Sequence, residues 1–121
     1  MVEYFTVKQK IINFMEVQII QKNGYTKALV SGRIDTITAS EFENAVNKAF
    51  EFEKTAIVLD CTKLDYISSS GLRVFLLLQK KAKASGISLS VCCLNPSIKE
   101  IFDISGFSGI FTILSEWKDT D

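Results

Sequence analysis

Three consecutive serines, Ser68, Ser69 and Ser70, and then Gly71 stand between a short apolar segment and a long, largely apolar segment of helical character. A turn from a strand into a helix places hydroxyl groups at a helix N-terminus, where backbone N–H groups lack intrahelical partners and the macrodipole favours negative charge. Such a position suits a serine that carries a phosphate, or a loop that binds one. Serines before a helix also act simply as N-caps, and the local pattern leaves both interpretations open.

Two side chains before the serines are candidates for other chemistry. Asp60 follows the apolar segment, as the phosphoacceptor aspartate of a receiver domain does, but a Mg²⁺ site needs further acidic ligands and the earlier segment offers only Asp35. Cys61 is a candidate nucleophile, yet Lys63 is the only cation close enough in the sequence to activate it. We therefore predict that Asp60 ends a strand and caps or supports the serine turn.

The absence of histidine removes several kinds of site. Without it there is no Ser-His-Asp or Cys-His pair, and Walker and Rossmann glycine spacings are absent too. Cys92 and Cys93 are neighbours on a predicted strand, so we expect their side chains on opposite faces, where they cannot share a metal ion. A structural zinc site usually needs about four N or S ligands. The sequence predicts a non-enzyme without metal or cofactor, with buried free thiols in a reducing compartment.

The composition fits one folded domain and limits its partners. The 121 residues are 47% apolar and 23% charged, which suffices for a single core. Basic and acidic side chains number 14 each, so no net basic field attracts nucleic acid or acidic lipid. The longest apolar run, residues 74–78, is far shorter than the roughly 20 residues of a membrane span, and no secretion signal is recognisable. We expect a cytoplasmic protein that binds neither nucleic acid nor membrane.

Periodicity, turn signals and helix caps predict five strands and three helices. Asn23-Gly24 reads as a hairpin turn, Thr38 and Glu41 fit a capping box, and Asn95-Pro96 supplies an N-cap with a first-turn proline. The expected strands cover residues 15–21, 25–30, 56–59, 87–93 and 111–114, and the expected helices cover about 39–52, 70–84 and 96–104.

The order β-β-α-β-α-β-α-β predicts an α/β domain, in which right-handed crossovers place helices against a mixed sheet of four to five strands. Residues 15–121 make up this domain, including a short polar C-terminal tail, and residues 1–14 precede it as an extension or an extra edge strand. In the second helix, the run 74–78 carries apolar side chains around the whole circumference. We therefore expect apolar surface near Val74 or Leu77 that either neighbouring elements or a partner cover.

Four segments of the chain together carry a family resemblance. They are Gly32-Arg33-Ile34-Asp35, Leu59-Asp60, Tyr66-Ile67-Ser68-Ser69-Ser70-Gly71-Leu72, and the helix after Asn95-Pro96. Over about residues 15–114 this pattern resembles the STAS domain of bacterial anti-sigma factor antagonists. The resemblance implies a mixed sheet flanked by helices, with a serine at the second helix's N-terminus that an anti-sigma factor serine kinase phosphorylates. The matching residue is Ser69, and the implied phosphatase is of the PP2C-like serine class.

The resemblance also implies a function, namely an antagonist that binds the kinase when unphosphorylated and releases it when phosphorylated. The implied partner-binding residues are Ser68, Ser70, Leu72, Arg73, Val74 and Leu77, and the implied supports of the phosphorylation site are Asp35, Asp60 and Gly71. The family's best-known form has an aspartate where this chain has Ser68, so Ser68 and Ser70 stay open as alternative acceptors. The alternative function is a STAS scaffold or sensor domain that binds an anionic nucleotide or lipid and is never phosphorylated.

Overall fold

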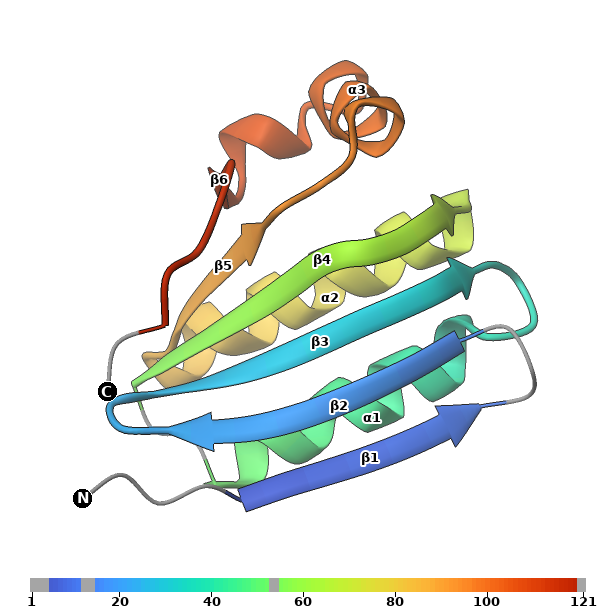
Figure 1. The fold of residues 1–121 in the computed structure, drawn as a ribbon. Helices are drawn as coiled ribbons and strands as arrows, with labels where there is room; N and C mark the ends of the chain where they lie inside the picture. The colour runs from blue at the N-terminus through green and yellow to red at the C-terminus, as the bar shows by residue number, and fades with distance from the viewer. Residues whose placement is uncertain (1–4, 12–14, 53–54, 120–121) are drawn as a thin grey trace.

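The computed structural model describes residues 5–11, 15–52 and 55–119. They form one mixed sheet in which each strand pairs with the next along the chain, in the order β1-β2-β3-β4-β5-β6 (Figure 1). The antiparallel part comprises β1 (Phe5–Ile11), β2 (Met15–Lys22) and β3 (Tyr25–Ile34). The parallel part continues from β3 through β4 (Ala56–Ile67), β5 (Ser88–Cys92) and β6 (Thr112–Leu114). The predicted α/β class and element order are confirmed, and β1 adds a sixth strand at the sheet edge.

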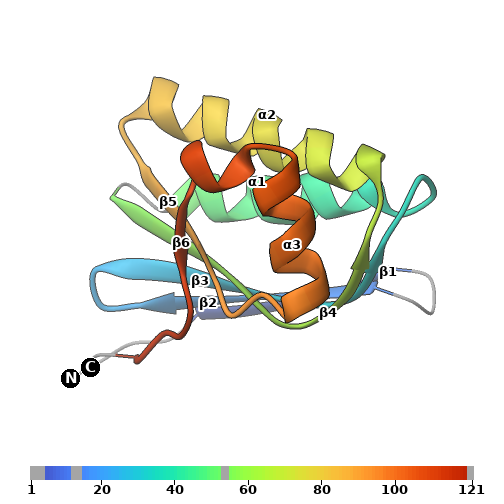
Figure 2. The same cartoon turned by 90° about the horizontal axis from the view of Figure 1, so that it is seen from above.

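Helices connect the parallel strands. α1 (Ala39–Phe52) follows β3, α2 (Ser69–Ser85) follows β4, and α3 (Pro96–Ile104) with the short 3-10 helix η1 (Phe107–Gly109) leads to β6. The parallel strands stand in the sheet in the same order as in the sequence, and the connections between them are right-handed crossovers. Successive helices therefore lie on the same face of the sheet. Figures 1 and 2 show α1 and α2 side by side against one face, while the opposite face carries none of the helices in the described part of the chain. None of the described helices is long and apolar enough to cross a membrane.

The core lies between the helices and the sheet. Its centre is a phenylalanine cluster in which Phe75 of α2 stacks on Phe42 of α1, with ring centroids 5.2 Å apart, and meets Phe102 of α3 edge-on at 5.4 Å. All three rings are fully buried. Because aromatic pairs add to the free energy of burying their large apolar surfaces, this cluster fixes the three helices relative to one another.

The strands β3 and β4 are longer than predicted. β4 runs for 12 residues, where the sequence predicted 56–59, so Asp60 lies inside the strand and the prediction that it ends there is wrong. The added half was missed because its exposed polar residues interrupt the apolar pattern, although every third residue remains buried. β3 likewise continues through Gly32 to Ile34, with two register shifts against β4, and Gly32 adopts φ 94° beside the second shift. A positive φ of this kind is easily adopted by glycine.

The polar C-terminal tail packs on the helix-free face of the sheet. Trp117 meets the ring of Tyr25 edge-on at 5.3 Å, and the hydroxyl of Tyr25 donates to Asp119 Oδ1 at 2.8 Å. Lys27 Nζ lies 2.8 Å from the second oxygen of Asp119. Trp117 thereby covers a second, smaller apolar cluster that includes Tyr25, Val58 and Cys92. The sequence predicted only a short polar tail, and this packing was not predicted.

Candidate functional site: a serine turn at the N-terminus of α2

The serine turn begins where two parallel strands end together. Ile34 of β3 and Ile67 of β4 are register partners, and the N–H of Ser68 donates to the carbonyl of Ile34 at 2.8 Å. Ser68 has an extended backbone and is the N-cap of α2, its Oγ accepting from the N–H of Gly71 at 3.2 Å. The start of α2 is therefore tied to both strands, and one of the N–H groups that a helix leaves unpaired is satisfied.

Gly71 allows α2 to approach the strand ends closely. A Cβ atom placed on it would lie 2.7 Å from Ile34 Cγ2 and 2.7 Å from Ile67 Cγ1. Both isoleucines belong to the core and, being β-branched, have little rotamer freedom with which to move aside. Gly71 therefore sets the position of the turn by close packing, which is consistent with its predicted supporting role.

The three serines differ in environment. Ser68 is half-buried with its hydroxyl engaged in the cap, and Ser70 is half-buried in the first turn of α2. Ser69 is exposed, and within residues 5–11, 15–52 and 55–119 its hydroxyl has no hydrogen-bond partner. A modifying enzyme would meet the hydroxyl of Ser69 before either of the others.

Helical spacing aligns Ser69 with two of the predicted partner-binding residues. Ser69, Arg73 and Leu77 follow one another at intervals of four residues on the outer side of α2, where such residues are neighbours. Arg73 is exposed and Leu77 is 39% exposed. Leu72 is half-buried against the core. Val74 is only 5% exposed and packs in the core with Phe75, so its predicted place on the partner surface is wrong.

Comparison with known proteins identifies the domain. A family model described as the STAS domain matches residues 16–119. The chain belongs to the STAS domain family. Its homology is to anti-sigma factor antagonists: BtrV of Bordetella bronchiseptica, which is named as one, is 34% identical over 99 residues, covering 82% of this chain and 85% of BtrV.

Solved structures share the fold of this STAS domain. An anti-sigma factor antagonist from Mycobacterium paratuberculosis superimposes with a TM-score of 0.66 at 20% identity, over 94% of this chain and 87% of that one. SpoIIAA in its unphosphorylated form gives a TM-score of 0.62 at 16% identity, over 93% and 90% of the two chains. The phosphorylated form of Bacillus SpoIIAA gives 0.56 at 16% identity, over 94% and 93%.

Two residues near the serine turn of the STAS domain were given no role by the sequence. The guanidinium of Arg33 lies 4.2 Å from the ring centroid of Tyr66, one register step before the pair Ile34 and Ile67. Ile37, in the loop after β3, is 71% exposed. An apolar residue between two threonines in a predicted loop is the signal that could have identified Ile37. Together they add a cation and an apolar side chain to the sheet end from which α2 begins.

Asp35 supports its own loop. Its Oδ1 accepts from the N–H of Ile37 at 2.9 Å and from that of Thr38 at 3.1 Å. These bonds hold the pKa of Asp35 below its ordinary value, the bond from Thr38 being the largest cause. α1 begins where predicted, but the predicted capping box is wrong, because the N–H of Thr38 donates to Asp35 and not to Glu41, and Thr38 Oγ1 donates to the carbonyl of Arg33. Asp35 thus shapes the loop that carries Ile37, and no bond joins its carboxylate to a serine of the described chain.

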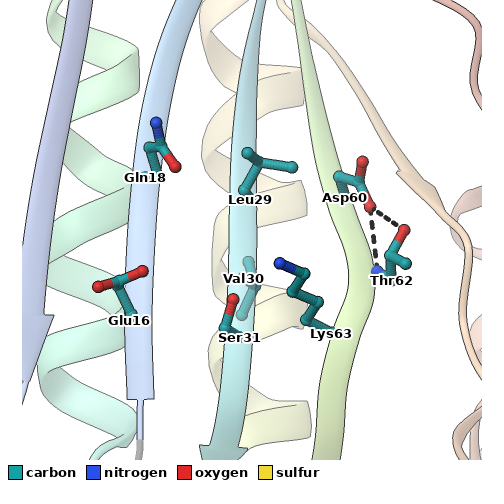
Figure 3. A pocket seen from close by; sticks show the side chains of 8 residues that line it. All are labelled: Glu16, Gln18, Leu29, Val30, Ser31, Asp60, Thr62 and Lys63. Atoms are coloured by element: carbon teal, nitrogen blue, oxygen red, sulfur yellow. Dashed lines mark hydrogen bonds between the residues drawn. The ribbon is translucent and has the colours of Figure 1, made fainter.

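Asp60 lies far from the serines. It lies seven positions before Ile67 at the end of β4, which at about 3.3 Å per residue is roughly 23 Å along the strand. Its Oδ1 accepts from the N–H of Thr62 at 3.0 Å and from Thr62 Oγ1 at 2.6 Å (Figure 3). The structure therefore does not bring Asp60 to the serine turn, contrary to its predicted supporting role.

A hollow of about 310 Å³ lies beside Asp60 on the helix-free face. Strands β2, β3 and β4 line it through Glu16, Gln18, Leu29, Val30, Ser31, Asp60, Thr62 and Lys63 (Figure 3). Acidic and basic side chains are mixed in this lining, and none of the lining residues belongs to the serine turn. This hollow is therefore not the concave anion receptor that the alternative function requires at the helix N-terminus.

The two adjacent cysteines depart from the prediction. β5 ends at Cys92, and Cys93 adopts φ 69°, a left-handed conformation that is uncommon for residues other than glycine. This turn ends the alternation of the strand, and the two sulfur atoms lie 2.7 Å apart instead of on opposite faces. All three cysteines are free thiols, and Cys61 is fully buried in the main core. Burial and the neighbouring Asp60 raise the pKa of the Cys61 thiol, which argues against a nucleophilic role.

Proposed function

We propose that this STAS domain is an anti-sigma factor antagonist switched by phosphorylation of Ser69. In the unphosphorylated state it binds a serine kinase that is also an anti-sigma factor, and phosphorylation by that kinase releases it. A PP2C-like serine phosphatase returns the domain to the binding state. The observation that carries this proposal is the exposed, unbonded hydroxyl of Ser69 at the N-terminus of α2, in line with Arg73 and Leu77.

The domain can accept the phosphate without unfolding. Phosphorylation adds roughly −1.5 to −2 charges and three acceptor oxygens. A negative charge at a helix N-terminus is favourable by about 0.3 to 1 kcal/mol when exposed. Arg73, one turn further along the exposed side of α2, offers a cation at the spacing of an i,i+4 pair. The phosphate therefore changes the surface of the domain and leaves the core intact.

The same phosphate opposes a partner docked over the turn. A protein surface shaped for a neutral serine would bury the new charge without a matching cation, and an unpaired buried charge costs about 2 to 5 kcal/mol. At about 1.4 kcal/mol per factor of ten, affinity would fall roughly 30- to 5,000-fold. The partner is released because its contact surface includes the modified side chain.

The relatives support this assignment. BtrV is named as an anti-sigma factor antagonist, and SpoIIAA has been solved in both phosphorylated and unphosphorylated forms on the same fold. In this chain the N-cap that α2 requires is provided by Ser68, which leaves Ser69 as the accessible hydroxyl.

The test is intact-mass and peptide mass spectrometry of the protein purified from its own cells. We expect one phosphate that maps to Ser69 and is absent from Ser69→Ala. Ser97→Ala is the matched control, because Ser97 is also an exposed serine in the first turn of a helix. No phosphate on Ser68, Ser69 or Ser70 under several growth conditions would contradict the switch and favour the unphosphorylated scaffold or sensor.

The binding half of the proposal is tested by capture from the same cells. Immobilised wild-type protein should retain a protein with kinase activity toward Ser69, and Ser69→Glu should retain much less of it. Leu77→Asp should also lose capture, because Leu77 is the exposed apolar residue in line with Ser69. Equal capture by wild type, Ser69→Glu and Leu77→Asp would place the partner on another surface and refute this part of the mechanism.

A further inference from the structure

Cys92 and Cys93 form a thiol pair on the helix-free face, away from the serine turn. Cys93 Sγ lies 2.7 Å from Cys92 Sγ, so the two sulfur atoms are in direct contact. Cys92 is fully buried beside Tyr25 and Val58, whereas Cys93 is half-buried and packs against the edge of that cluster with Leu114 and Trp117. One thiol of the pair is therefore open to a small reagent, and the other lies behind it.

A shared metal ion fits this geometry poorly. Asp60 completes a group whose ligand atoms all lie within 4.8 Å of one another. Two thiolates bound to one tetrahedral zinc at about 2.3 Å each stand about 3.8 Å apart, which is much longer than the observed separation. Lys27 Nζ also lies 4.0 Å from Asp60 Oδ2 and would repel a cation placed there. The separation of the sulfurs favours a covalent bond between them over a common ligand.

We propose that Cys92 and Cys93 are an oxidative modification site, at which thiol–disulfide exchange with a low-molecular-weight disulfide of the glutathione class joins the two neighbouring sulfurs. The thiolate of Cys93 attacks one sulfur of the small disulfide, forming a mixed disulfide and expelling one small thiolate. The thiolate of Cys92 then attacks Cys93 Sγ, closing the bond between the two residues and expelling the second small thiolate. Two electrons pass from the cysteine pair to the reagent, and the two expelled thiolates take up the two protons that the cysteines release.

Burial makes ring closure the slower of the two steps. Desolvation, and next the hydrogen bond with Cys93, raise the pKa of the Cys92 thiol, so its thiolate is scarce at neutral pH. The product is also expected to be readily reduced. Adjacent Cα atoms are about 3.8 Å apart across a trans peptide, whereas ordinary disulfides span about 4.4 to 6.8 Å. The site therefore suits a reversible modification better than a permanent structural bond.

The test incubates reduced, folded protein with oxidised glutathione, followed by alkylation in denaturant and peptide mapping. Wild type should lose alkylation at both Cys92 and Cys93, lose the mass of two hydrogens, and retain no glutathione. Cys92→Ser should stop at the first step and retain one glutathione on Cys93. Cys93→Ser should retain none on the buried Cys92, and Cys61→Ser, which changes only the core thiol, should behave as wild type.

The single tryptophan provides a second readout on the folded protein. Trp117 and Cys93 both pack against the cluster that includes Cys92, so closure should change the fluorescence of Trp117, and dithiothreitol should restore it. Retention of glutathione by wild type without closure would overturn the proposal, as would alkylation of both thiols after prolonged exposure to oxidised glutathione. Protection of both thiols by stoichiometric Zn²⁺ in the reduced protein would also overturn it and establish a metal site.

Discussion

Replacing Gly71 by alanine tests whether close packing positions the serine turn. The added Cβ would lie 2.7 Å from Ile34 Cγ2 and equally close to Ile67 Cγ1. Both contacts are made by side chains of the core, so neither isoleucine can rotate toward solvent. The first turn of α2 would have to move away from the ends of β3 and β4.

Two opposing effects determine the magnitude. Overpacking a filled core costs about 1 to 3 kcal/mol. Alanine gains up to about 1 kcal/mol over glycine in a helix interior, and this gain is smaller in the first turn, where Gly71 lies. Overpacking should dominate, and we expect the free energy of unfolding to fall by about 1 to 2 kcal/mol.

Urea unfolding of both proteins measures this difference. At a slope of about 2 kcal/mol per M of urea, within the usual range for a domain of this size, the midpoint should fall by about 0.5 to 1 M with the slope unchanged. Gly109→Ala is the matched control, because a Cβ on Gly109 would have no heavy atom within 4 Å. Its effect should stay within about 0.5 kcal/mol.

A Gly71→Ala variant as stable as wild type would refute this reasoning. It would mean that the helix start shifts at no cost, and that the turn is not held by the fit of Gly71 against the two isoleucines. Equal destabilisation by Gly109→Ala would also refute it, because the loss of stability would then be a general effect of replacing glycine by alanine.

The remaining predictions concern the cap, the surface of α2 and the tail. Ser68→Ala should lower the urea-derived free energy of unfolding by about 1 kcal/mol through loss of the N-cap, whereas Ser68→Asp keeps an acceptor there and should be at least as stable as wild type at neutral pH. Val74→Ala should cost about 2 kcal/mol in the same assay because Val74 is in the core, while Leu77→Ala should stay within about 0.5 kcal/mol. The hydrogen bond from Lys27 holds the pKa of Asp119 below its ordinary 3.8. The ionised Asp119 carboxylate therefore stabilises the fold above pH 3.8, and this stabilisation is lost as the pH falls through the lower pKa of the folded state. Unfolding free energies of Asp119→Asn and wild type should therefore differ at pH 6 to 7 and converge in acid, and a difference that persists unchanged in acid would contradict the ionic contact.

Local capping chemistry made the starts of α2 and α3 predictable. Ser68 and Asn95 both act as side-chain N-caps, and Pro96 occupies the first turn after Asn95. Each of these signals involves residues within four positions of one another, so the sequence alone contains the information. The closing glycine of α2 is equally local, since Gly86 adopts the left-handed conformation expected of a C-cap.

The length of β4 depended on neighbours that are distant in sequence. Its second half is exposed at Thr62, Lys63, Asp65 and Tyr66, which removes the continuous apolar run of a strand buried on both faces. The strand persists because β3 pairs with it through to Ile34 and Ile67. The distance of Asp60 from the serine turn follows from this pairing, which local periodicity does not reveal.

The helix-free face was the least predictable part of the fold. The contact of Trp117 with Tyr25 joins residues 92 positions apart, and no local sequence pattern predicts it. The meeting of Cys92 and Cys93 depends on the left-handed backbone of a single residue just beyond β5. The alternation of side chains along a strand predicts the correct face of the sheet up to Cys92, but it predicts the wrong face for Cys93.

The attachment of α2 to the strand ends bears on the timing of the proposed switch. Since Gly71 fits against two core isoleucines and Ser68 bonds to both Ile34 and Gly71, the first turn cannot shift without disturbing the core. A new phosphate on Ser69 would meet its partner with no loop or hinge motion on the microsecond to millisecond scale to precede it. The delay between signal and response would then be set by the kinase, the phosphatase and partner dissociation alone.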